Sequence, residues 1–498
     1  MPGSVDGGRR LRTVVIGAGP GGLCMAKGML DAGFDDFVLL ERSHGVGGTW
    51  NLNRYPGAAC DVQSHLYSFS FELNPGWSRP YAPQPEILAY LQRLAEKYGI
   101  LPHCRFDAEV TGATWDGDAA TWTVRLASGE ELEADVVVSA LGMFHTAVPP
   151  TIEGLDTFGG TVFHASLREW DHDLTGESVA VIGSAASAVQ FVPKIVEVAE
   201  RVHLFQRSAN WVLPKPDDPY TDEQLAAFRA DPAICRTIRD EIFRHMDAGI
   251  TFSDPAAVAE REAAGLAAIE VVEDPELRAK LRPTHPFGCK RPLFSNDYYP
   301  AFNRPNLELV TEGIERVTPD GVRTVDGGER RVDTIVLATG FATTQFLSVL
   351  DVVGRDGRHL RQAWADGATA YLGVTTAGFP NLFMLYGPNT NNGSILTMIE
   401  YQVDHVVAHL RRLVDEDLAW VDVRPEAEAA YNLEVDRAVA SIDVWQAGCN
   451  DYYRTPSGRV VTQWPFPMTE FQRRTETIDP AAYEVVPRHR GAVRTGVA

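Results

Sequence analysis

A length of 498 residues is enough for two or three ordinary domains, and 45% apolar with 22% charged residues excludes disorder as the main state. Lys and Arg number 45 against 67 Asp and Glu, which gives a formal net charge of −22 spread along the chain. This acidic balance disfavours nucleic acid or an anionic membrane as a partner. We expect neither a nucleic-acid nor a membrane partner, and no obligate protein partner is evident from the sequence.

The six cysteines are widely scattered and form no CxxC or CxxxxC pair. This spacing argues against a zinc site, a disulfide framework and a dithiol reductase mechanism, so we expect no metal site. No segment reaches the ~18 uninterrupted apolar residues of a membrane helix, and residues 1–10 lack the apolar core of a signal peptide. We expect a cytoplasmic protein.

Residues 12–42 predict a strand, a glycine turn, a helix over about 21–32 and a second strand. Gly17, Gly19 and Gly22 have the G-x-G-x-x-G spacing, which permits a tight turn and close approach of a pyrophosphate to the backbone. Glu41 lies about 20 residues further on, where a carboxylate accepts ribose hydroxyls. We predict a dinucleotide site; the alternative is a tight strand–helix turn without a ligand.

The next segments indicate where the first domain ends. Residues 109–139 alternate like an antiparallel meander and end in an apolar run at 136–138. The stretch 141–150, with Gly142 and two prolines, is typical of a connector between domains. We predict domains at 1–148, 149–345 and 346–498, the last returning to the first domain and ending in a substrate-pocket segment.

A second strand–turn–helix pattern follows at 178–205, with its helix near 186–199. In its turn, Ala185 adds a methyl group where a glycine would meet the pyrophosphate. The strand ends in Gln206 and Arg207 rather than in an acid, and Arg207 can pair bidentately with a 2′-phosphate. This favours NADPH over NADH; the alternative is a surface arginine that merely ends a strand.

Two dinucleotide turns in one chain favour an oxidoreductase that holds a flavin and a nicotinamide together. Residues 222–281 predict a helical insertion at about 220–285. Residues 307–337 repeat the meander and end like 136–142, and a helix is expected over about 395–413. We predict an α/β fold with two Rossmann-like dinucleotide-binding domains, for FAD and NADPH, and a helical insertion.

The stretch 47–61 resembles a long signature of the Baeyer–Villiger monooxygenases: Gly-Gly-x-Trp, four residues, aromatic-Pro-Gly, three residues, Asp. A second signature of that family, Phe-x-Gly-x-x-x-His-x-x-x-Trp, is matched at Phe158, Gly160 and His164. Position 168 is arginine, and the nearest tryptophan is Trp170, which a two-residue insertion explains.

Further matches to the family lie at 205–211, 288–292 and 338–341. Residues 387–391 resemble the hydroxyacetophenone-monooxygenase branch more than the cyclohexanone branch, although the long N-terminal extension of the former is absent. The chain therefore resembles a class B flavoprotein monooxygenase over roughly residues 10–490.

The resemblance implies that NADPH reduces FAD, that O₂ forms a C4a-peroxyflavin, and that one oxygen is inserted beside a ketone carbonyl to give an ester or lactone. Arg291 would be the catalytic electrostatic group, and Asp61 would orient Arg291 and the nicotinamide amide. His164 would be a linker residue, and Tyr452 would stand where relatives have a pocket tryptophan. The candidate cofactor-binding residues are Gly17, Gly19, Gly22, Glu41, Gly48, Thr49, Trp50, Asp61, Tyr67, Val110, Gly183, Ser184, Ala185, Ser187, Gln206, Arg207 and Lys290.

Two other functions compete with this prediction. A flavin-containing monooxygenase that oxygenates sulfur or nitrogen shares the two glycine turns, but the stretch 47–61 and Arg291 favour ketone oxygenation. An NADPH oxidase or a non-catalytic nucleotide-binding protein is the other alternative, motivated by Ala185 and the shifted Trp170.

Overall fold

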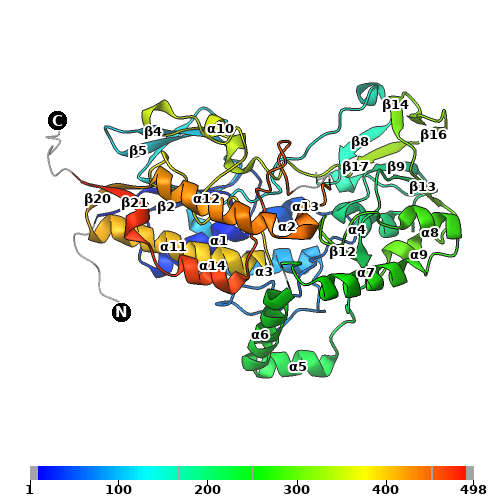
Figure 1. Ribbon diagram of the computed structural model, residues 1–498, viewed down its shortest axis with the longest axis horizontal. Coiled ribbons are helices and arrows are strands. Elements are labelled where there is room, and N and C mark those ends of the chain that lie inside the picture. The colour runs from blue at the N-terminus through cyan, green and yellow to red at the C-terminus, as the bar shows by residue number, and fades with distance from the viewer. Residues whose placement is uncertain (1–8, 167–168, 250, 450–452, 489–498) are drawn as a thin grey trace.

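Two five-stranded parallel sheets, each at the centre of its own lobe, form the framework of the molecule (Figure 1). The computed structural model describes residues 9–166, 169–249, 251–449 and 453–488. None of the helices in these ranges has the length and apolar character needed to cross a lipid bilayer.

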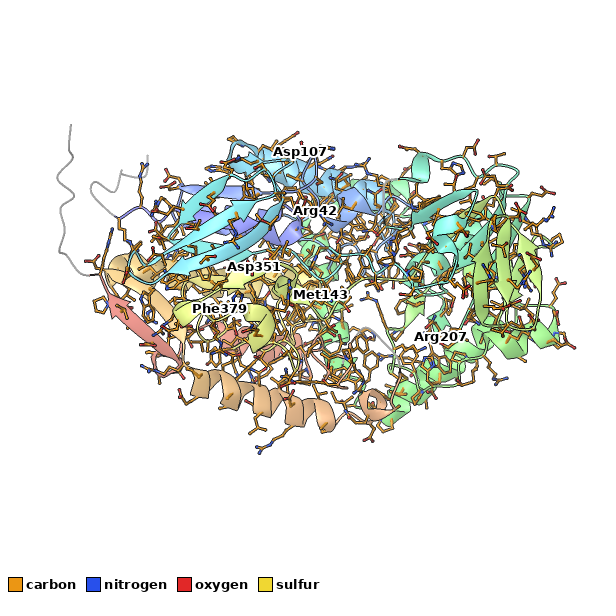
Figure 2. All side chains as sticks on the ribbon, turned by 90° about the horizontal axis from the view of Figure 1, so that it is seen from above. Arg42, Asp107, Met143, Arg207, Asp351 and Phe379 are labelled. Carbon is orange, nitrogen blue, oxygen red and sulfur yellow. A yellow bond between two sulfur atoms is a disulfide. The ribbon has the colours of Figure 1, made fainter. Side chains whose placement is uncertain are left out.

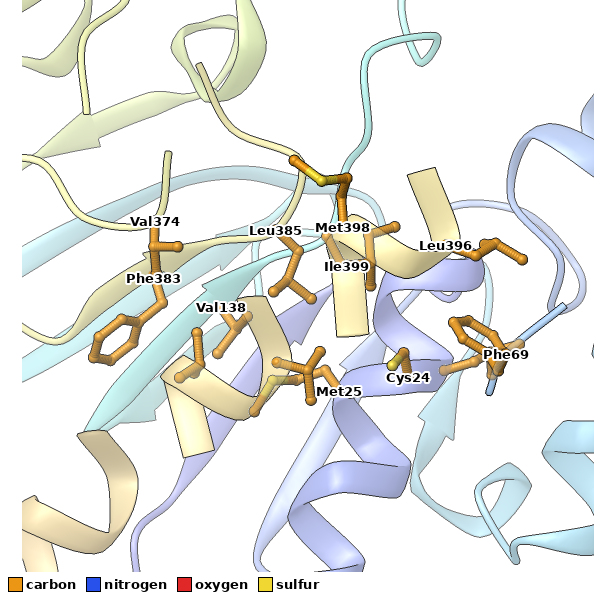
Figure 3. Close-up of a cluster of buried hydrophobic side chains, with 14 of the residues drawn as sticks. Cys24, Met25, Phe69, Val138, Val374, Phe383, Leu385, Leu396, Met398 and Ile399 are labelled. Atoms are coloured by element: carbon orange, nitrogen blue, oxygen red, sulfur yellow. The ribbon is translucent and has the colours of Figure 1, made fainter. Parts of the chain in front are cut away.

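The first sheet has the order β19-β7-β1-β2-β3, and all of its neighbouring strands run parallel. Its central strands are apolar and fully buried, as expected when helices cover both faces. Figure 3 shows the core between α1 and α11, where Met25 faces Ile399 near Leu385. The elements are β1 (Thr13–Ile16), α1 (Pro20–Asp31), β2 (Phe37–Leu40), α3 (Gln84–Lys97), β3 (Cys104–Arg105), β7 (Val136–Ser139), β19 (Leu382–Met384) and α11 (Ile395–Asp415).

The predicted meander forms a separate sheet beside this lobe, with the order β18-β4-β5-β6. β4 (Val110–Asp116), β5 (Thr121–Leu126) and β6 (Glu131–Ala134) are antiparallel, whereas β18 (Asp351–Val353) joins β4 in parallel. The chain therefore returns to the first lobe after it has formed the second.

The second sheet has the order β13-β10-β9-β17-β8 and is also parallel throughout. Its helix α4 ends at Ile195, earlier than the predicted 199, and carries Pro193 in its last turn. β17 borders β9 as β7 borders β1, so the repeated ending of the two meanders marks equivalent strands. The elements of this lobe are β8 (Thr161–His164), β9 (Ser178–Ile182), α4 (Ala186–Ile195), β10 (Arg201–Phe205), α9 (Tyr298–Ala301), β13 (Leu307–Val310) and β17 (Thr334–Leu337). A separate antiparallel sheet is formed by β14 (Ile314–Thr318), β15 (Gly321–Thr324) and β16 (Glu329–Arg331).

Four helices between β10 and β13 form the insertion: α5 (Asp222–Ala230), α6 (Pro232–Gly249), α7 (Pro255–Ile269) and α8 (Pro275–Leu281). Thr221, Asp254 and Asp274 cap the N-termini of α5, α7 and α8 by accepting backbone N–H groups. α5 and α6 project from the body of the molecule in Figure 1, whereas α7 packs on β11 (Val212–Leu213) of the second lobe.

The C-terminal segment closes over the first lobe. α12 (Pro425–Ala440) and α14 (Met468–Thr475) flank α11, and β20 (Leu418–Val423) pairs with β21 (Tyr483–Pro487). The short helix α13 (Asp443–Gln446) lies near the middle of Figure 1, on the side of the second lobe. The remaining short elements are α2 (Thr49–Leu52), η1 (Leu101–His103), η2 (Leu155–Thr157), η3 (Glu169–Asp171), β12 (Leu293–Phe294), η4 (Phe346–Val349), η5 (Arg355–Gly357), α10 (Leu360–Ala363) and η6 (Pro480–Ala482).

Candidate active site

A cavity of about 1810 Å³ lies where the carboxyl ends of the two parallel sheets face each other. In open parallel sheets this is the edge at which ligands bind. All predicted site residues line the cavity except Gly22. Figure 2 shows the lining residues Arg42 and Met143 in one lobe and Arg207 in the other. The volume exceeds the ~300–1,000 Å³ of a pocket for one small ligand, which indicates room for more than one.

The first glycine turn is shaped by close backbone packing. Gly17 has φ +103°, and a Cβ atom there would lie 2.7 Å from the carbonyl oxygen of Ala140. Gly22 lies behind the turn, where a Cβ would meet the carbonyl oxygen of Gly17 at 1.9 Å. Gly48 has φ +52°, and a side chain there would meet the Cα of Gly19 at 2.7 Å. Two glycine segments thus form an open cradle of bare backbone.

Glu41 follows β2 and is only 6% exposed. Its Oε2 accepts a hydrogen bond from the backbone N–H of Ala18 at 2.9 Å, and its Oε1 accepts one from Ser43 at 2.9 Å. Each carboxylate oxygen keeps a further lone pair. The side chain is therefore held rigidly at the cavity wall with acceptor capacity for ligand hydroxyl groups.

Trp50 and Tyr67 form the next part of the wall. The Trp50 Nε1 donates to the Tyr67 hydroxyl at 2.9 Å, and the two rings meet edge to face at 5.7 Å. Burial raises the pKa of Tyr67 well above its usual value, which keeps the phenol neutral. Thr49 and Val110 line the same region.

The second glycine turn needs only one glycine. Gly183 has φ +110°, and a Cβ there would lie 2.4 Å from the carbonyl oxygen of Ala338. Ala185 caps α4 with φ −89°, a conformation open to any residue, so its methyl group requires no strain. Asn210, which the sequence did not single out, donates to the carbonyl oxygen of Ser184 at 2.8 Å and fixes the turn. Ser187 follows in the first turn of α4 and also lines the cavity.

A cationic corner lies at the end of β10. Arg207 is exposed to the cavity and, within the described part of the chain, forms no ion pair with a carboxylate. The Lys290 Nζ donates to the neighbouring Ser208 hydroxyl at 2.8 Å. Gln206 is buried and donates to the carbonyl oxygen of Lys280 at 3.2 Å, which ties this corner to α8. In a chain of charge −22 this corner is suited to an anion.

Asp61 and Arg291 meet across the cavity from different lobes. The Arg291 Nε and Nη2 both donate to the Asp61 Oδ2, at 3.1 and 2.5 Å. Asp61 comes from the segment after α2, and Arg291 lies two residues before β12 of the second lobe. The structure thus brings the two predicted catalytic residues together.

Gln190 on α4 docks the 55–61 segment against the second lobe, a contact that sequence patterns did not reveal. Its Oε1 accepts from the Tyr55 hydroxyl at 3.0 Å, and its Nε2 donates to the carbonyl oxygen of Ala59 at 3.0 Å. Burial raises the pKa of Tyr55 to about 12, so this hydroxyl stays protonated. Gly57 lies so close that a Cβ would meet the Gln190 carbonyl oxygen at 2.7 Å.

The connector between the lobes supplies aromatic wall residues. Phe144 and Phe341 meet at 5.4 Å, and His164 lies edge-on to Phe341 at 6.0 Å. Trp170 packs on Phe191 at 5.0 Å, so the shifted tryptophan is part of the second core. Arg168 and Tyr452 lie outside the described residues.

A disulfide joins Cys289 to Cys449, whose Cα atoms lie 6.1 Å apart although 160 residues separate them. The prediction against a disulfide framework was therefore wrong for this pair, because the fold and not the local spacing brings the two cysteines together. The other four cysteines are free. Within the described ranges, no cluster of three or more His, Cys, Asp or Glu side chains could hold a metal ion.

Comparisons with known proteins agree with this geometry. A family model described as pyridine nucleotide-disulphide oxidoreductase matches residues 14–239. A Baeyer–Villiger monooxygenase of Pseudomonas aeruginosa is 40% identical over 487 residues, covering 96% of this chain and 92% of that protein. A steroid monooxygenase solved with NADP is 33% identical with a TM-score of 0.86, covering 96% of this chain and 100% of that one.

A solved structure titled as an OTEMO complex with FAD and NADP is 28% identical, also with a TM-score of 0.86, and covers 96% of this chain and 99% of that one. The likeness in sequence and in structure extends over both lobes and the cavity between them. The chain belongs to the Baeyer–Villiger monooxygenase family.

Proposed function

We propose that this chain binds FAD in the first lobe and NADPH in the second, and inserts one atom of O₂ beside the carbonyl of a ketone to give an ester or lactone. The observation that most strongly supports this proposal is the Asp61–Arg291 ion pair, which joins the two lobes at the cavity. Residues 1–148 and 346–498 would form the FAD-binding part, and 149–345 the NADPH-binding part with its insertion at about 220–285.

The first lobe fits FAD. The bare backbone at Gly17, Gly19 and Gly48 leaves a cradle that side chains would fill, which suits a pyrophosphate approaching the N-terminus of α1. Glu41 would accept the ribose hydroxyls. Trp50, Tyr67, Val110 and Thr49 would enclose the ring system.

The second lobe fits NADPH. Gly183, Ser184 and the N-terminus of α4 would hold the pyrophosphate, with Ala185 and Ser187 beside it. Arg207 and Lys290 supply the positive charge that a 2′-phosphate needs, and Gln206 positions this corner. A ligand without the 2′-phosphate would leave the charge of Arg207 unpaired.

When bound, the reduced flavin supplies activated oxygen, and the protein positions the ketone and excludes water. Arg291 carries a permanent positive charge at the cavity, where it would stabilise negative charge that develops on oxygen. Asp61 accepts from both Nε and Nη2 of Arg291 and so fixes the orientation of the guanidinium plane in the site.

The test is a panel of ketones incubated with NADPH and isotopically labelled O₂, scored for labelled ester or lactone. We expect one labelled oxygen per product and NADPH consumption in step with it. Labelled sulfoxide without any ester would instead indicate a sulfur-oxygenating enzyme, and peroxide release with every substrate would indicate an oxidase.

Arg291→Ala should lower the rate of ester formation about 10²–10³-fold, the loss typical of removing one group that stabilises an oxyanion. Arg304→Ala is the matched control, because that arginine is exposed beyond α9 and does not line the cavity. Unchanged ester formation by Arg291→Ala would refute the catalytic role of Arg291.

A further inference from the structure

The Cys289–Cys449 disulfide crosses from one lobe to the other beside the cavity. Cys289 precedes Lys290 and Arg291 in the segment that leads into β12 of the second lobe. Cys449 follows α13, whose Trp445 is buried in the core of the first lobe. Figure 1 shows α13 near the middle of the molecule.

The two ends of the bridge differ in access. Cys289 is only 1% exposed. The preceding Gly288 has φ +87°, and a Cβ atom added there would lie 2.8 Å from the ring of Phe252. Cys449 is half-buried and lines the cavity together with Lys290 and Arg291. A thiol reagent that enters the cavity therefore reaches the Cys449 sulfur first.

The Asp61–Arg291 ion pair contributes little free energy to holding the Arg291 segment. The side chains of Arg291 and Asp61 are 34% and 24% exposed, and ion pairs with such access to water contribute only about 0–1 kcal/mol. The Lys290–Ser208 hydrogen bond lies within the second lobe and does not cross between lobes. The disulfide is the covalent link that fixes the segment against the first lobe.

We propose that Cys289 and Cys449 form a redox-modification site, a tether that is closed as the disulfide and open as the dithiol. The closed tether holds the Lys290–Arg291 segment against the C-terminal segment and retains the nicotinamide dinucleotide in the cavity; the open tether releases it faster. The dinucleotide part of this inference rests on the proposed function.

The chemistry balances with ordinary thiol reagents. A dithiol reductant attacks the Cys449 sulfur, expels the Cys289 thiolate and forms a mixed disulfide, which its second thiol then resolves. Two electrons and two protons pass to the protein. In the reverse direction, hydrogen peroxide oxidises one cysteine to a sulfenic acid and releases water; the second cysteine then displaces a second water to form the bridge.

The first experiment needs no mutation. The full-length protein is oxidised with hydrogen peroxide or reduced with dithiothreitol, freed of reagent, denatured and alkylated with N-ethylmaleimide. Of the six cysteines, the four free ones should be alkylated in the oxidised sample and all six in the reduced sample. Cys449→Ser should give five alkylated cysteines in both samples, and Cys104→Ser, the control, should keep the two-cysteine difference.

Hydrogen exchange then measures the tether directly. In the reduced protein, amides of residues 287–293 and 443–449 should exchange about five-fold faster or more, whereas residues 17–22 should not change. Full alkylation of every cysteine in both samples, or equal exchange of the two segments in both forms, would overturn the proposal.

The second experiment uses the thermodynamic linkage between disulfide formation and NADP⁺ binding. The protein is equilibrated in mixtures of reduced and oxidised glutathione with and without NADP⁺, and the bridged fraction is read from alkylation. If the closed form binds NADP⁺ about five-fold more tightly, NADP⁺ must favour bridging by the same factor. Binding of NADP⁺ without any shift overturns the dinucleotide part. Absence of NADP⁺ binding in both forms counts instead against the proposed function, while alkylation and exchange still decide the tether.

Discussion

Arg207 shows how a single residue can set the choice of dinucleotide. It is exposed to the cavity at the end of β10 and, among the described residues, has no carboxylate partner to satisfy its charge. A 2′-phosphate would neutralise the charge of Arg207. Lys290, which donates to the hydroxyl of the neighbouring Ser208, supplies a second positive charge there.

Arg207→Gln should therefore weaken NADPH binding. Loss of one charge-assisted contact costs about 2 kcal/mol, so the KM for NADPH should rise roughly thirty-fold. The KM for NADH should stay within two-fold, because NADH offers no 2′-phosphate to lose. Steady-state oxidation of both nucleotides measures this, with Arg229→Gln on α5 as the control. An equal rise in both KM values would show that Arg207 does not recognise the phosphate.

At the residue scale, the sequence predicted best what depends on local backbone. The positions of Gly17 and Glu41 at one cavity follow from a strand, a turn and a helix that are close in sequence. Gln190 donates a hydrogen bond to Ala59, which lies 131 residues away in the sequence, and Cys289 forms a disulfide with a cysteine 160 residues away. No short pattern contains such contacts, because only the packed fold creates them.

At the scale of elements, the turn around η5 is fastened to β20 by a buried carboxylate. The Asp422 Oδ2 accepts from the Arg355 Nη1 at 3.3 Å, and both of its oxygens accept from the Gly378 N–H at 3.1 Å. Burial nevertheless raises the pKa of Asp422 to about 7, since it outweighs the favourable contacts with Arg355 and Gly378. Arg355 in turn pairs with Glu484 on β21 and covers the ring of Trp420 at 4.5 Å.

This raised pKa predicts how stability depends on pH. The folded state holds the Asp422 proton up to about pH 7, whereas the unfolded chain releases it near pH 4. Binding of this proton therefore stabilises the folded state at low pH, and that stabilisation is lost as the pH rises between these two values. The free energy of unfolding should fall by at most about 1.4 kcal/mol per pH unit from this group. Asp422→Asn should remove that slope in urea unfolding between pH 5 and 8. An unchanged slope would show that Asp422 is ionised throughout.

Element types were more predictable than element ends or pairings. The apolar runs at 136–139 and 334–337 predicted buried strands, and each lies beside the strand that leads into the glycine turn of its lobe. Residues 307–310 looked like part of a meander but form β13 at the edge of the parallel sheet. A four-residue apolar run does not determine which strand it will pair with, because strand pairing depends on the whole sheet.

At the scale of the whole molecule, the helical insertion fastens the second lobe to the first. The insertion branches from the second lobe, yet Arg239 on α6 is 6% exposed inside the first. Its Nη1 donates to the carbonyl oxygen of Leu66 at 3.0 Å, and its Nη2 donates to Glu400 of α11 at 3.4 Å. Glu400 also accepts from the N–H of Ser70 at 2.7 Å, so one buried pair holds three segments.

Arg239→Met should destabilise the protein by about 3–5 kcal/mol, because it leaves the Glu400 carboxylate buried without its cation. Burial already raises the pKa of Glu400, and loss of Arg239 should raise that pKa further. Protonation then relieves the penalty, so the deficit should shrink as pH falls from 8 to 5. Thermal unfolding at several pH values measures this.

Two further variants separate charge from packing. Arg239→Met combined with Glu400→Leu should recover most of the loss and show no pH-dependent deficit, since no buried charge is left unpaired. Arg236→Met, on the exposed face of the same helix, should change stability by no more than about 0.5 kcal/mol. If the double variant were as unstable as Arg239→Met at every pH, the attachment of the insertion would depend on the shape of the arginine side chain and its bond to Leu66 rather than on the ion pair.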